Sequence, residues 1–336
     1  MYRTWWTTLL FALSVAGTAL AAGRTSPPSG AKVVRQGTTT SGEYATLSAA
    51  VAALPDDGTA QSIFIYAGNY TEQVYIDRDD VTIYGYTTDV QKYTHNVVTI
   101  SHMQDAARAG SDDASGTLRI HSNNVKLYNI NIENTRGPGS QAIALSAYSD
   151  QFGAYAVGLY GYQDTLLAQS GNQVYLKGYI EGATDFIFGQ HAVSYFQGNT
   201  IAVTAGGCIT ANGRGSSDDP SIYVFNNNVV KNSSTASSTP GNYFFGRAWG
   251  VYSRVIFLNT DLEVTPNAAI WKAWSDTQDT TNIFYGDYNT TGSDVPSKVS
   301  EPSWTQKLTS SAESTYSITS VLGSSYTSWV DTAYLS

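Results

Sequence analysis

The sequence contains very little cysteine, histidine or charge. Cys208 is the single cysteine in 336 residues, so no disulfide can form within the chain and no cysteine pair can bind a metal. We expect Cys208 to be a small buried core residue. The four histidines are scattered and no His-Glu-x-x-His occurs, which argues against zinc chemistry. Gly-x-Ser-x-Gly, the serine elbow of many hydrolases, is also absent.

Charged residues make up 13% of the chain, about half the usual share for a soluble domain. Its polar surface must therefore come mainly from Ser, Thr, Asn, Gln and Tyr, a composition that favours an extracellular β-rich protein. The formal net charge of −9 argues against a nucleic-acid partner, because binding to phosphates requires a basic face.

The N-terminal segment 1–21 has the features of a secretory signal peptide. Arg3 supplies the positive start, an apolar stretch covers 5–20, and Ala19-Leu20-Ala21 fits a small-residue cleavage site. A membrane anchor is the alternative. We favour cleavage, which predicts a secreted protein without a membrane partner. We expect the rest of the chain, 22–336, to form a single domain.

A short helix is predicted near the start of this domain and short strands after it. Tyr44, Leu47, Val51 and Leu54 recur at helical spacing and end at Pro55. Segments 62–66 and 81–84 are rich in β-forming residues and bounded by Gly, Asn or Asp, which indicates strands.

A recurring unit follows, in which a large apolar residue ends a β-forming run and Gly or Asn comes two positions later. The intervals between successive units are irregular. Asn suits sharp corners because it tolerates left-handed backbone geometry. The units are 83–85, 127–129, 159–161, 176–178, 196–198, 225–227 and 257–259.

One short strand per irregular unit predicts an all-β fold, a right-handed parallel β-helix, in which each coil stacks on the one before. The helix at 44–54 would cap one open end, and the Ser/Thr-rich tail 301–336 would lie along the side. A β-sandwich is the rival architecture, but it would show strict alternation and regular hairpin turns.

Polar residues interrupt three apolar segments at nearly constant spacing. The interval from Gln141 to Gln163 is almost the same as the interval from Asp164 to Asp185. In a solenoid with coils of this length, these residues would lie on neighbouring coils, about 4.8 Å apart. Two carboxylates that close would have pKa values that split, and two amides could stabilise an oxyanion. Spacing alone leaves a structural polar ladder equally open.

Three acidic pairs could in principle bind calcium, although such pairs in loops are usually only solvated. They are Asp79-Asp80, Asp112-Asp113 and Asp218-Asp219. We expect no metal and no cofactor.

Five segments, in order, resemble the signature motifs of the pectin methylesterase family of carbohydrate esterases. The resemblance runs from about Val33 into the final third of the chain and implies a β-helical enzyme that hydrolyses methyl esters of polygalacturonate. The segments are GNYTE (68–72), QAIAL (141–145), GYQDTL (161–166), DFIFG (185–189) and GRAW (246–249). We expect GNYTE to be structural.

The resemblance implies a role for each matched residue. Asp185 would be the nucleophile and Asp164 the acid and then the base. Gln141 and Gln163 would stabilise the oxyanion, with Gln141 also contacting substrate. Arg247 would contact substrate, orient Asp185 and lower its pKa.

Substrate platforms and other contacts follow from the same resemblance. Trp249 would stack on a sugar ring, and Trp271 is a second candidate platform, with core packing as its alternative. Plant members carry a substrate-contacting Thr about thirty residues before the first glutamine, and 111–115 offers no clear equivalent. The absence of an inhibitor-like pro-region is typical of a fungal form, which we expect to act as a monomer on methyl-esterified homogalacturonan.

Three sequons are candidate glycosylation sites, at Asn69, Asn232 and Asn289. Asn232 belongs to the polar run 231–241, the segment we most expect to be an exposed loop.

Two other functions are alternatives to a methylesterase. A polygalacturonase-type glycosidase would use an Asn-Thr-Asp like that at 259–261, although this chain has no His-Gly dipeptide. A non-catalytic carbohydrate-binding solenoid would keep the aromatic residues without needing both Asp164 and Asp185.

Overall fold

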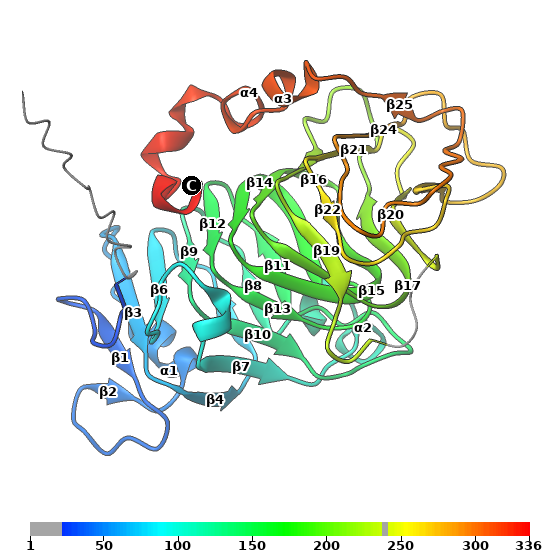
Figure 1. Cartoon of the computed structure of the whole chain (residues 1–336). Coiled ribbons are helices and arrows are strands. Elements are labelled where there is room, and N and C mark those ends of the chain that lie inside the picture. Colours follow the sequence, from blue (N-terminus) through cyan, green and yellow to red (C-terminus); the bar gives the residue numbers. More distant parts are fainter. Residues whose placement is uncertain (1–21, 237–240) are drawn as a thin grey trace, which may run out of the picture.

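The computed structural model describes residues 22–236 and 241–336, so the predicted signal peptide lies outside the described residues. Its strands form three parallel sheets that stack coil upon coil (Figure 1). Every pairing between named strands is parallel. A β-sandwich would need antiparallel pairs. The predicted parallel β-helix is therefore the fold.

The first sheet contains one strand from each coil along most of the chain. In stacking order its strands are β1 (Lys32–Val34), β3 (Gln61–Ile65), β6 (Val81–Gly85), β9 (Lys126–Tyr128), β12 (Phe152–Tyr155), the end of β14 (Leu166–Leu176), β16 (His191–Gln197), β18 (Ile222–Asn226), β21 (Arg254–Leu258), β24 (Phe284–Tyr288) and β25 (Gln306–Lys307). The short β2 (Glu43–Tyr44) pairs with β1.

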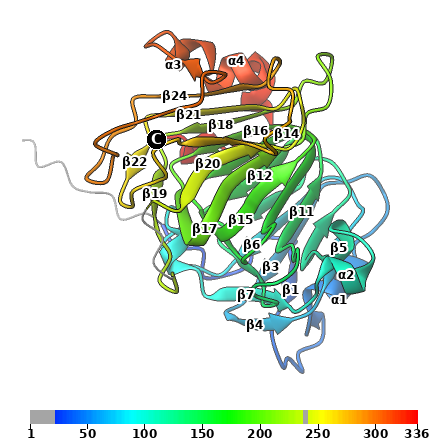
Figure 2. The same ribbon diagram turned by 90° about the vertical axis from the view of Figure 1, so that its right-hand side faces the viewer.

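The second and third sheets share two long strands that bend from one to the other. The second sheet comprises β4 (Gly68–Thr71), β7 (Val98–His102), β10 (Asn131–Asn134), β13 (Gly158–Tyr160), the starts of β15 (Tyr179–Gly189) and β17 (Thr200–Asn212), β19 (Val229–Asn232) and β22 (Asp261–Leu262). The third comprises β5 (Val74–Ile76), β8 (Leu118–Ile120), β11 (Leu145–Tyr148), the start of β14, the ends of β15 and β17, β20 (Tyr243–Ala248) and β23 (Trp271–Ala273) (Figure 2).

The interior is filled by apolar side chains that stack in register along the coils. Phe196, Phe225 and Phe257 lie on successive strands of the first sheet, with ring centroids 4.3 and 4.2 Å apart. All three are fully buried. At these three units the repeated apolar residue noted in the sequence is thus the inward-facing position of its coil, whereas Leu176 of unit 176–178 belongs to the cluster on the outer face.

Corners after these strands use left-handed residues, as the Asn positions predict. Asn129, Asn227 and Asn259 have φ of 53°, 53° and 51°. Asn259 also belongs to a stack of asparagine side chains, since its amide donates to Asn226 Oδ1 at 3.0 Å and the Asn289 amide donates to Asn259 Oδ1 at 2.7 Å.

The predicted helix is present but shorter than expected. α1 spans Leu47–Ala52, because Tyr44 pairs in β2 and Thr46 caps the helix by accepting from the Ala49 amide. Leu47 is buried in the core at the N-terminal end. Glu72 of the GNYTE segment accepts from the Leu47 and Ser48 amides, which gives this segment a structural role.

The other helices are short as well, and the C-terminal ones cover the first sheet. They are α2 (Ala106–Ala109), α3 (Ala312–Thr315), α4 (Ile318–Leu322), and the 3-10 turns η1 (Tyr93–His95), η2 (Asp113–Ser115), η3 (Ser324–Ser328) and η4 (Thr332–Tyr334). Leu322, Trp329 and Val330 pack on the outer face of the first sheet, so the tail lies along the side as predicted (Figure 1). Within the described part of the chain no helix is long and apolar enough to cross a membrane.

The asparagines of the three sequons are all exposed, but they differ in whether the side chain already has a partner. Asn69 is exposed in β4. Asn232 is exposed at the end of β19, where it has an interaction partner, and 237–240 of the polar run that contains it lie outside the described residues. Asn289 is exposed, but its amide already donates to Asn259.

The stacked phenylalanines predict a large mutational cost. Phe225→Ala should lower the free energy of unfolding by about 3–5 kcal/mol, because it leaves a cavity between two rings. Met103→Ala, at a side chain that is 59% exposed, is the control and should cost under about 0.5 kcal/mol. Urea denaturation measures both, and equal losses would contradict the stacking account.

Candidate active site

A pocket of about 240 Å³ opens on the third sheet and collects the residues that the motifs single out. Its lining includes both predicted aspartates, both glutamines, the arginine and the first of the predicted tryptophan platforms. The lining consists of Asp112, Gln141, Gln163, Asp164, Asp185, Phe188, Ala211, Arg247, Trp249 and Trp274.

Backbone hydrogen bonds between coils bring the two aspartates together. Gln163 pairs in parallel with Thr184, and the Asp164 amide donates to the Thr184 carbonyl at 3.1 Å. Asp164 therefore lies level with Asp185 on the next coil, at strand spacing. The Ala142 amide donates to the Gln163 carbonyl at 3.1 Å, which places Gln141 beside them on the coil before. The predicted stacking of these residues is confirmed.

Both aspartates have left-handed backbone conformations. Asp164 has φ of 63° and Asp185 has φ of 51°. Non-glycine residues rarely adopt this region, although Asp tolerates it better than most, and such positions concentrate at functional sites. The same local geometry on two coils turns both carboxylates into one pocket.

Arg247 on β20 forms a bidentate ion pair with Asp185. Its Nε donates to Oδ1 at 2.8 Å and to Oδ2 at 3.1 Å, and its Nη2 also donates to Oδ2. The arginine is held in turn, because Tyr285 Oη donates to its carbonyl at 3.0 Å and the Trp274 ring lies 4.0 Å from its guanidinium. This fork fixes the orientation of the Asp185 carboxylate.

The two carboxyls have different electrostatic surroundings. Burial, followed by repulsion from Asp185 and Asp112, raises the pKa of Asp164 to about 8. Burial also raises the pKa of Asp185, but the Arg247 hydrogen bonds and charge oppose that rise. Arg247 thus lowers this pKa as expected, although burial outweighs the ion pair and keeps the pKa above its ordinary value. Asp185 is nonetheless the more acidic of the two, since Asp164 has no such partner.

The remaining polar groups of the pocket are free to bind a ligand. The side-chain amides of Gln141 and Gln163 form no hydrogen bond with any residue in 22–236 or 241–336. Trp249 is 37% exposed, and its ring lies 6.4 Å from Phe188 and 6.4 Å from Trp274. The pocket thus combines amide donors with an exposed aromatic rim.

Trp271 does not reach this pocket, so the prediction that it is a substrate platform is wrong. Its side chain is 1% exposed and packs against Phe245, Phe257 and Tyr285 in the interior. Ile270, with φ of 58°, turns the chain just before it. The exposed platform in this segment is Trp274, which is 40% exposed and lines the pocket.

Sequence reasoning also missed Asp112, which lines the pocket from the coil before Gln141. It lies in the segment where the plant-type Thr had no clear equivalent.

Cys208 is buried as expected, and burial raises the pKa of its thiol to about 12, which makes it a poor nucleophile.

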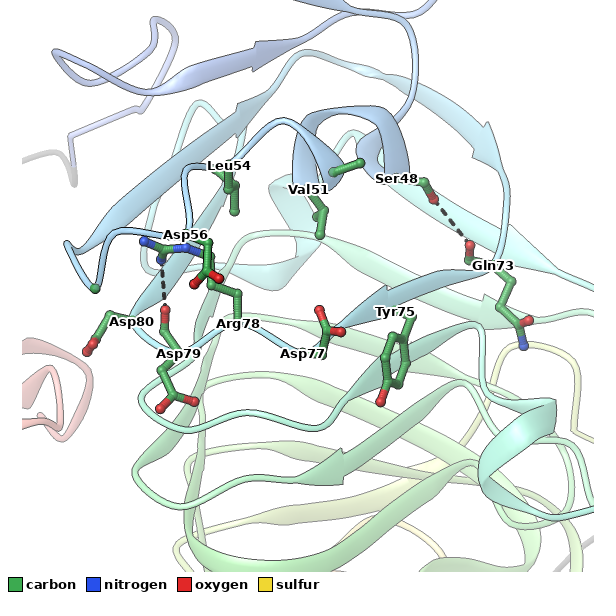
Figure 3. A pocket seen from close by; sticks show the side chains of 12 residues that line it. Ser48, Val51, Leu54, Asp56, Gln73, Tyr75, Asp77, Arg78, Asp79 and Asp80 are labelled. Carbon is green, nitrogen blue, oxygen red and sulfur yellow. Dashed lines mark hydrogen bonds between the residues drawn. The ribbon is translucent and has the colours of Figure 1, made fainter.

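A larger hollow of about 830 Å³ lies near α1, and its lining includes neither the two aspartates nor the two glutamines of the smaller pocket (Figure 3). It is lined by Ser48, Tyr75 and several aspartates. Arg78 is occupied there, since it donates to the Asp79 carbonyl at 2.9 Å and to two other backbone carbonyls. The smaller pocket has a carboxylate paired with a cation, next to amides that are free to bind a ligand. The residues that line this larger hollow do not offer that combination.

The glycosidase-like Asn-Thr-Asp lies elsewhere. Asn259 belongs to the asparagine stack, Thr260 is buried, and Asp261 is exposed on β22 of the second sheet. Its residues do not line the pocket.

The fold and the pocket define a class, a β-helical enzyme whose site is built on two carboxylates. The family model for pectinesterases matches residues 32–325. A pectinesterase from Aspergillus aculeatus is 45% identical over 334 residues, which cover 97% of each chain.

Solved structures agree with this assignment. The pectin methylesterase from Aspergillus niger, crystallised in deglycosylated form, has a TM-score of 0.85 at 36% identity, covering 93% of this chain and 100% of that chain. The pectin methylesterase from carrot has a TM-score of 0.77 at 27% identity, covering 91% and 96%. The chain belongs to the pectinesterase family and is an esterase of the fungal type.

Asp164 should hold its proton at neutral pH. The infrared band of a protonated carboxyl that is lost in Asp164→Asn should titrate with a midpoint of about 8. Asp185→Asn should lower that midpoint, because it removes a like charge. A midpoint near the ordinary value of about 4 would contradict the burial of this group.

Proposed function

We propose that this chain is a secreted pectin methylesterase that hydrolyses the C6 methyl esters of polygalacturonate through an acyl-enzyme on Asp185. The observation that carries the proposal is the bidentate pair between Arg247 and Asp185, placed beside a buried carboxyl with a raised pKa. Such a pair supplies an ionised, aimed nucleophile and a protonated acid at the same pH.

In the first half of the reaction, an Asp185 oxygen attacks the ester carbonyl carbon. The carbonyl oxygen becomes an oxyanion that accepts hydrogen bonds from the amides of Gln141 and Gln163. Asp164 gives its proton to the methoxy oxygen as the C–O bond breaks, and methanol leaves. A mixed anhydride between Asp185 and the uronate remains.

In the second half, the now ionised Asp164 takes a proton from a water molecule. The resulting hydroxide attacks the uronyl carbonyl, and the same two amides stabilise the second oxyanion. Asp185 departs as a carboxylate, and Arg247 stabilises the returning charge. Asp164 ends protonated, as it began.

Binding of the polymer would rest on the aromatic rim. Trp249 and Trp274 offer exposed ring faces beside the pocket, and sugar rings present apolar C–H faces that such surfaces bind. Arg247 lines the same pocket, and its Nη1 is not used in the ion pair with Asp185. The preferred substrate is methyl-esterified homogalacturonan, with the protein acting as a monomer.

Secretion and glycosylation complete the proposal. The N-terminal segment would direct export and be cleaved near Ala21, leaving one catalytic domain from Ala22 onward. Of the three sequons, Asn69 is the one we propose to carry a glycan, because its side chain is exposed in a strand and no hydrogen bond within the described residues uses its amide. At Asn289 the amide is already engaged.

The direct test is methanol release from highly esterified pectin by the purified protein. Asp185→Ala should reduce the rate by about 10³-fold or more, and Gln163→Ala by about 10²–10³-fold, because each removes a group needed in the transition state. Circular dichroism should show that both variants keep the β-helix.

Asp261→Ala is the matched control, since Asp261 belongs to the glycosidase-like tripeptide and lies outside the pocket. Its methanol release should equal that of the unmodified protein. Shortening of pectin chains that Asp261→Ala abolishes, with no methanol formed, would identify a glycosidase instead. Binding of pectin with no reaction would identify a carbohydrate-binding solenoid.

A further inference from the structure

Asp112 is fixed in the pocket wall by the turn that follows it. Its carbonyl accepts from the Ser115 amide at 3.0 Å and from Ser115 Oγ at 2.6 Å. Ser115 is buried, and its Oγ accepts from the Ile143 amide at 3.2 Å. Asp112 is thereby held against the segment that carries Gln141.

The two neighbouring aspartates of this turn have different surroundings. Asp113 is satisfied by the protein, because Arg119 Nη2, His121 Nε2 and Ser146 Oγ lie 2.5, 2.9 and 2.7 Å from its carboxylate. The Asp112 carboxylate forms no hydrogen bond or ion pair with any residue in the described ranges. It lines the pocket instead.

The described residues that line the pocket provide no free cation to balance the negative charge of Asp112. The lining residues include three carboxyl groups and one cation, Arg247, which is committed to Asp185. Strand pairing runs from β8 through β11, β14, β15 and β17 to β20. Asp112 precedes β8 and Arg247 lies in β20, so the two flank the central aspartates on opposite sides along the solenoid.

We propose that Asp112 is a specificity-determining residue that selects a methyl-esterified, uncharged uronate for the sugar bound on its side of the reacting ester. This inference rests on the proposed function. A free uronate there would face an unpaired carboxylate in a partly buried site, where like-charge repulsion is weakly screened. A methyl ester removes that repulsion, and the sugar hydroxyls can donate to Asp112.

The role differs from that of a contact which only binds sugar. An uncharged hydroxyl, such as that of a threonine, would bind either form of the neighbour with similar affinity. The charge of Asp112 makes the binding depend on esterification. Burial also raises the pKa of Asp112. Esterified and free uronates should therefore be compared near neutral pH, where substrate uronates are ionised.

The experiment compares kcat/KM for methanol release from pectins of high and low esterification, near neutral pH and at low salt. Asp112→Asn keeps the size of the side chain and removes the charge. It should improve the low-ester rate relative to the high-ester rate by about tenfold, a difference of about 1.4 kcal/mol. In the unmodified enzyme, added salt should reduce the discrimination, because it screens the repulsion.

Asp261→Asn removes an equivalent charge outside the pocket and should leave the ratio of the two rates unchanged. If Asp112→Asn changes both rates by the same factor, Asp112 acts only on the reaction centre and the proposal is overturned. Failure of the unmodified protein to release methanol from either pectin would reject the proposed function itself.

A binding measurement covers the case in which Asp112→Asn loses activity. Fully de-esterified oligogalacturonate should bind Asp112→Asn about tenfold more tightly than the unmodified protein in calorimetry, at low salt. Asp112→Thr should behave in the same way, because it also removes the charge. Equal affinities for all three proteins would overturn the proposal.

Discussion

Backbone hydrogen bonds between successive coils determine where every group of the site lies. The amide of Asp164 donates to the carbonyl of Thr184, so the coil that carries one aspartate cannot slide against the coil that carries the other. Parallel strands repeat at about 4.8 Å, which is close enough for two carboxyls to interact strongly. The stacked phenylalanines of the interior reinforce this register. Site geometry is therefore a direct consequence of the solenoid.

Given that closeness, the position of a single cation decides which carboxyl is ionised. Arg247 lies on β20, two strand pairings beyond Asp185, and its side chain reaches back to make the bidentate pair. Asp164 is left buried without a paired cation, and burial raises its pKa to about 8. A fold that repeats the same backbone on each coil thus produces two chemically different aspartates, because their side-chain neighbours differ.

Much of the architecture could be predicted from local signals. Asn and Gly at recurring positions after apolar runs indicate corners, and those corners have left-handed geometry at Asn129, Asn227 and Asn259. The nearly equal spacings of the glutamines and the aspartates match the local coil length, so they predict the pairing of Asp164 with Asp185. Spacing could not separate this pair from a structural ladder, and the motif resemblance supplied that distinction.

The predictions that were wrong or missing concern the direction of side chains, which no pattern in this sequence encodes. Trp271 and Trp274 are close neighbours in the chain, but the left-handed turn at Ile270 directs the first into the core while the second is exposed. Asp112 and Asp113 are adjacent, and only the structure reveals that cationic and hydroxyl partners satisfy Asp113 alone. Each outcome depends on neighbours from other coils.

The central claim is that Arg247 keeps Asp185 ionised as the nucleophile, and the acidic limb of the pH profile tests it most directly. Arg247→Gln should move the acidic limb of kcat/KM for methanol release upward by about one pH unit or more, since an opposite charge this close lowers a carboxyl pKa by about 1–3 units. A lower maximal rate with an unmoved acidic limb would contradict the account.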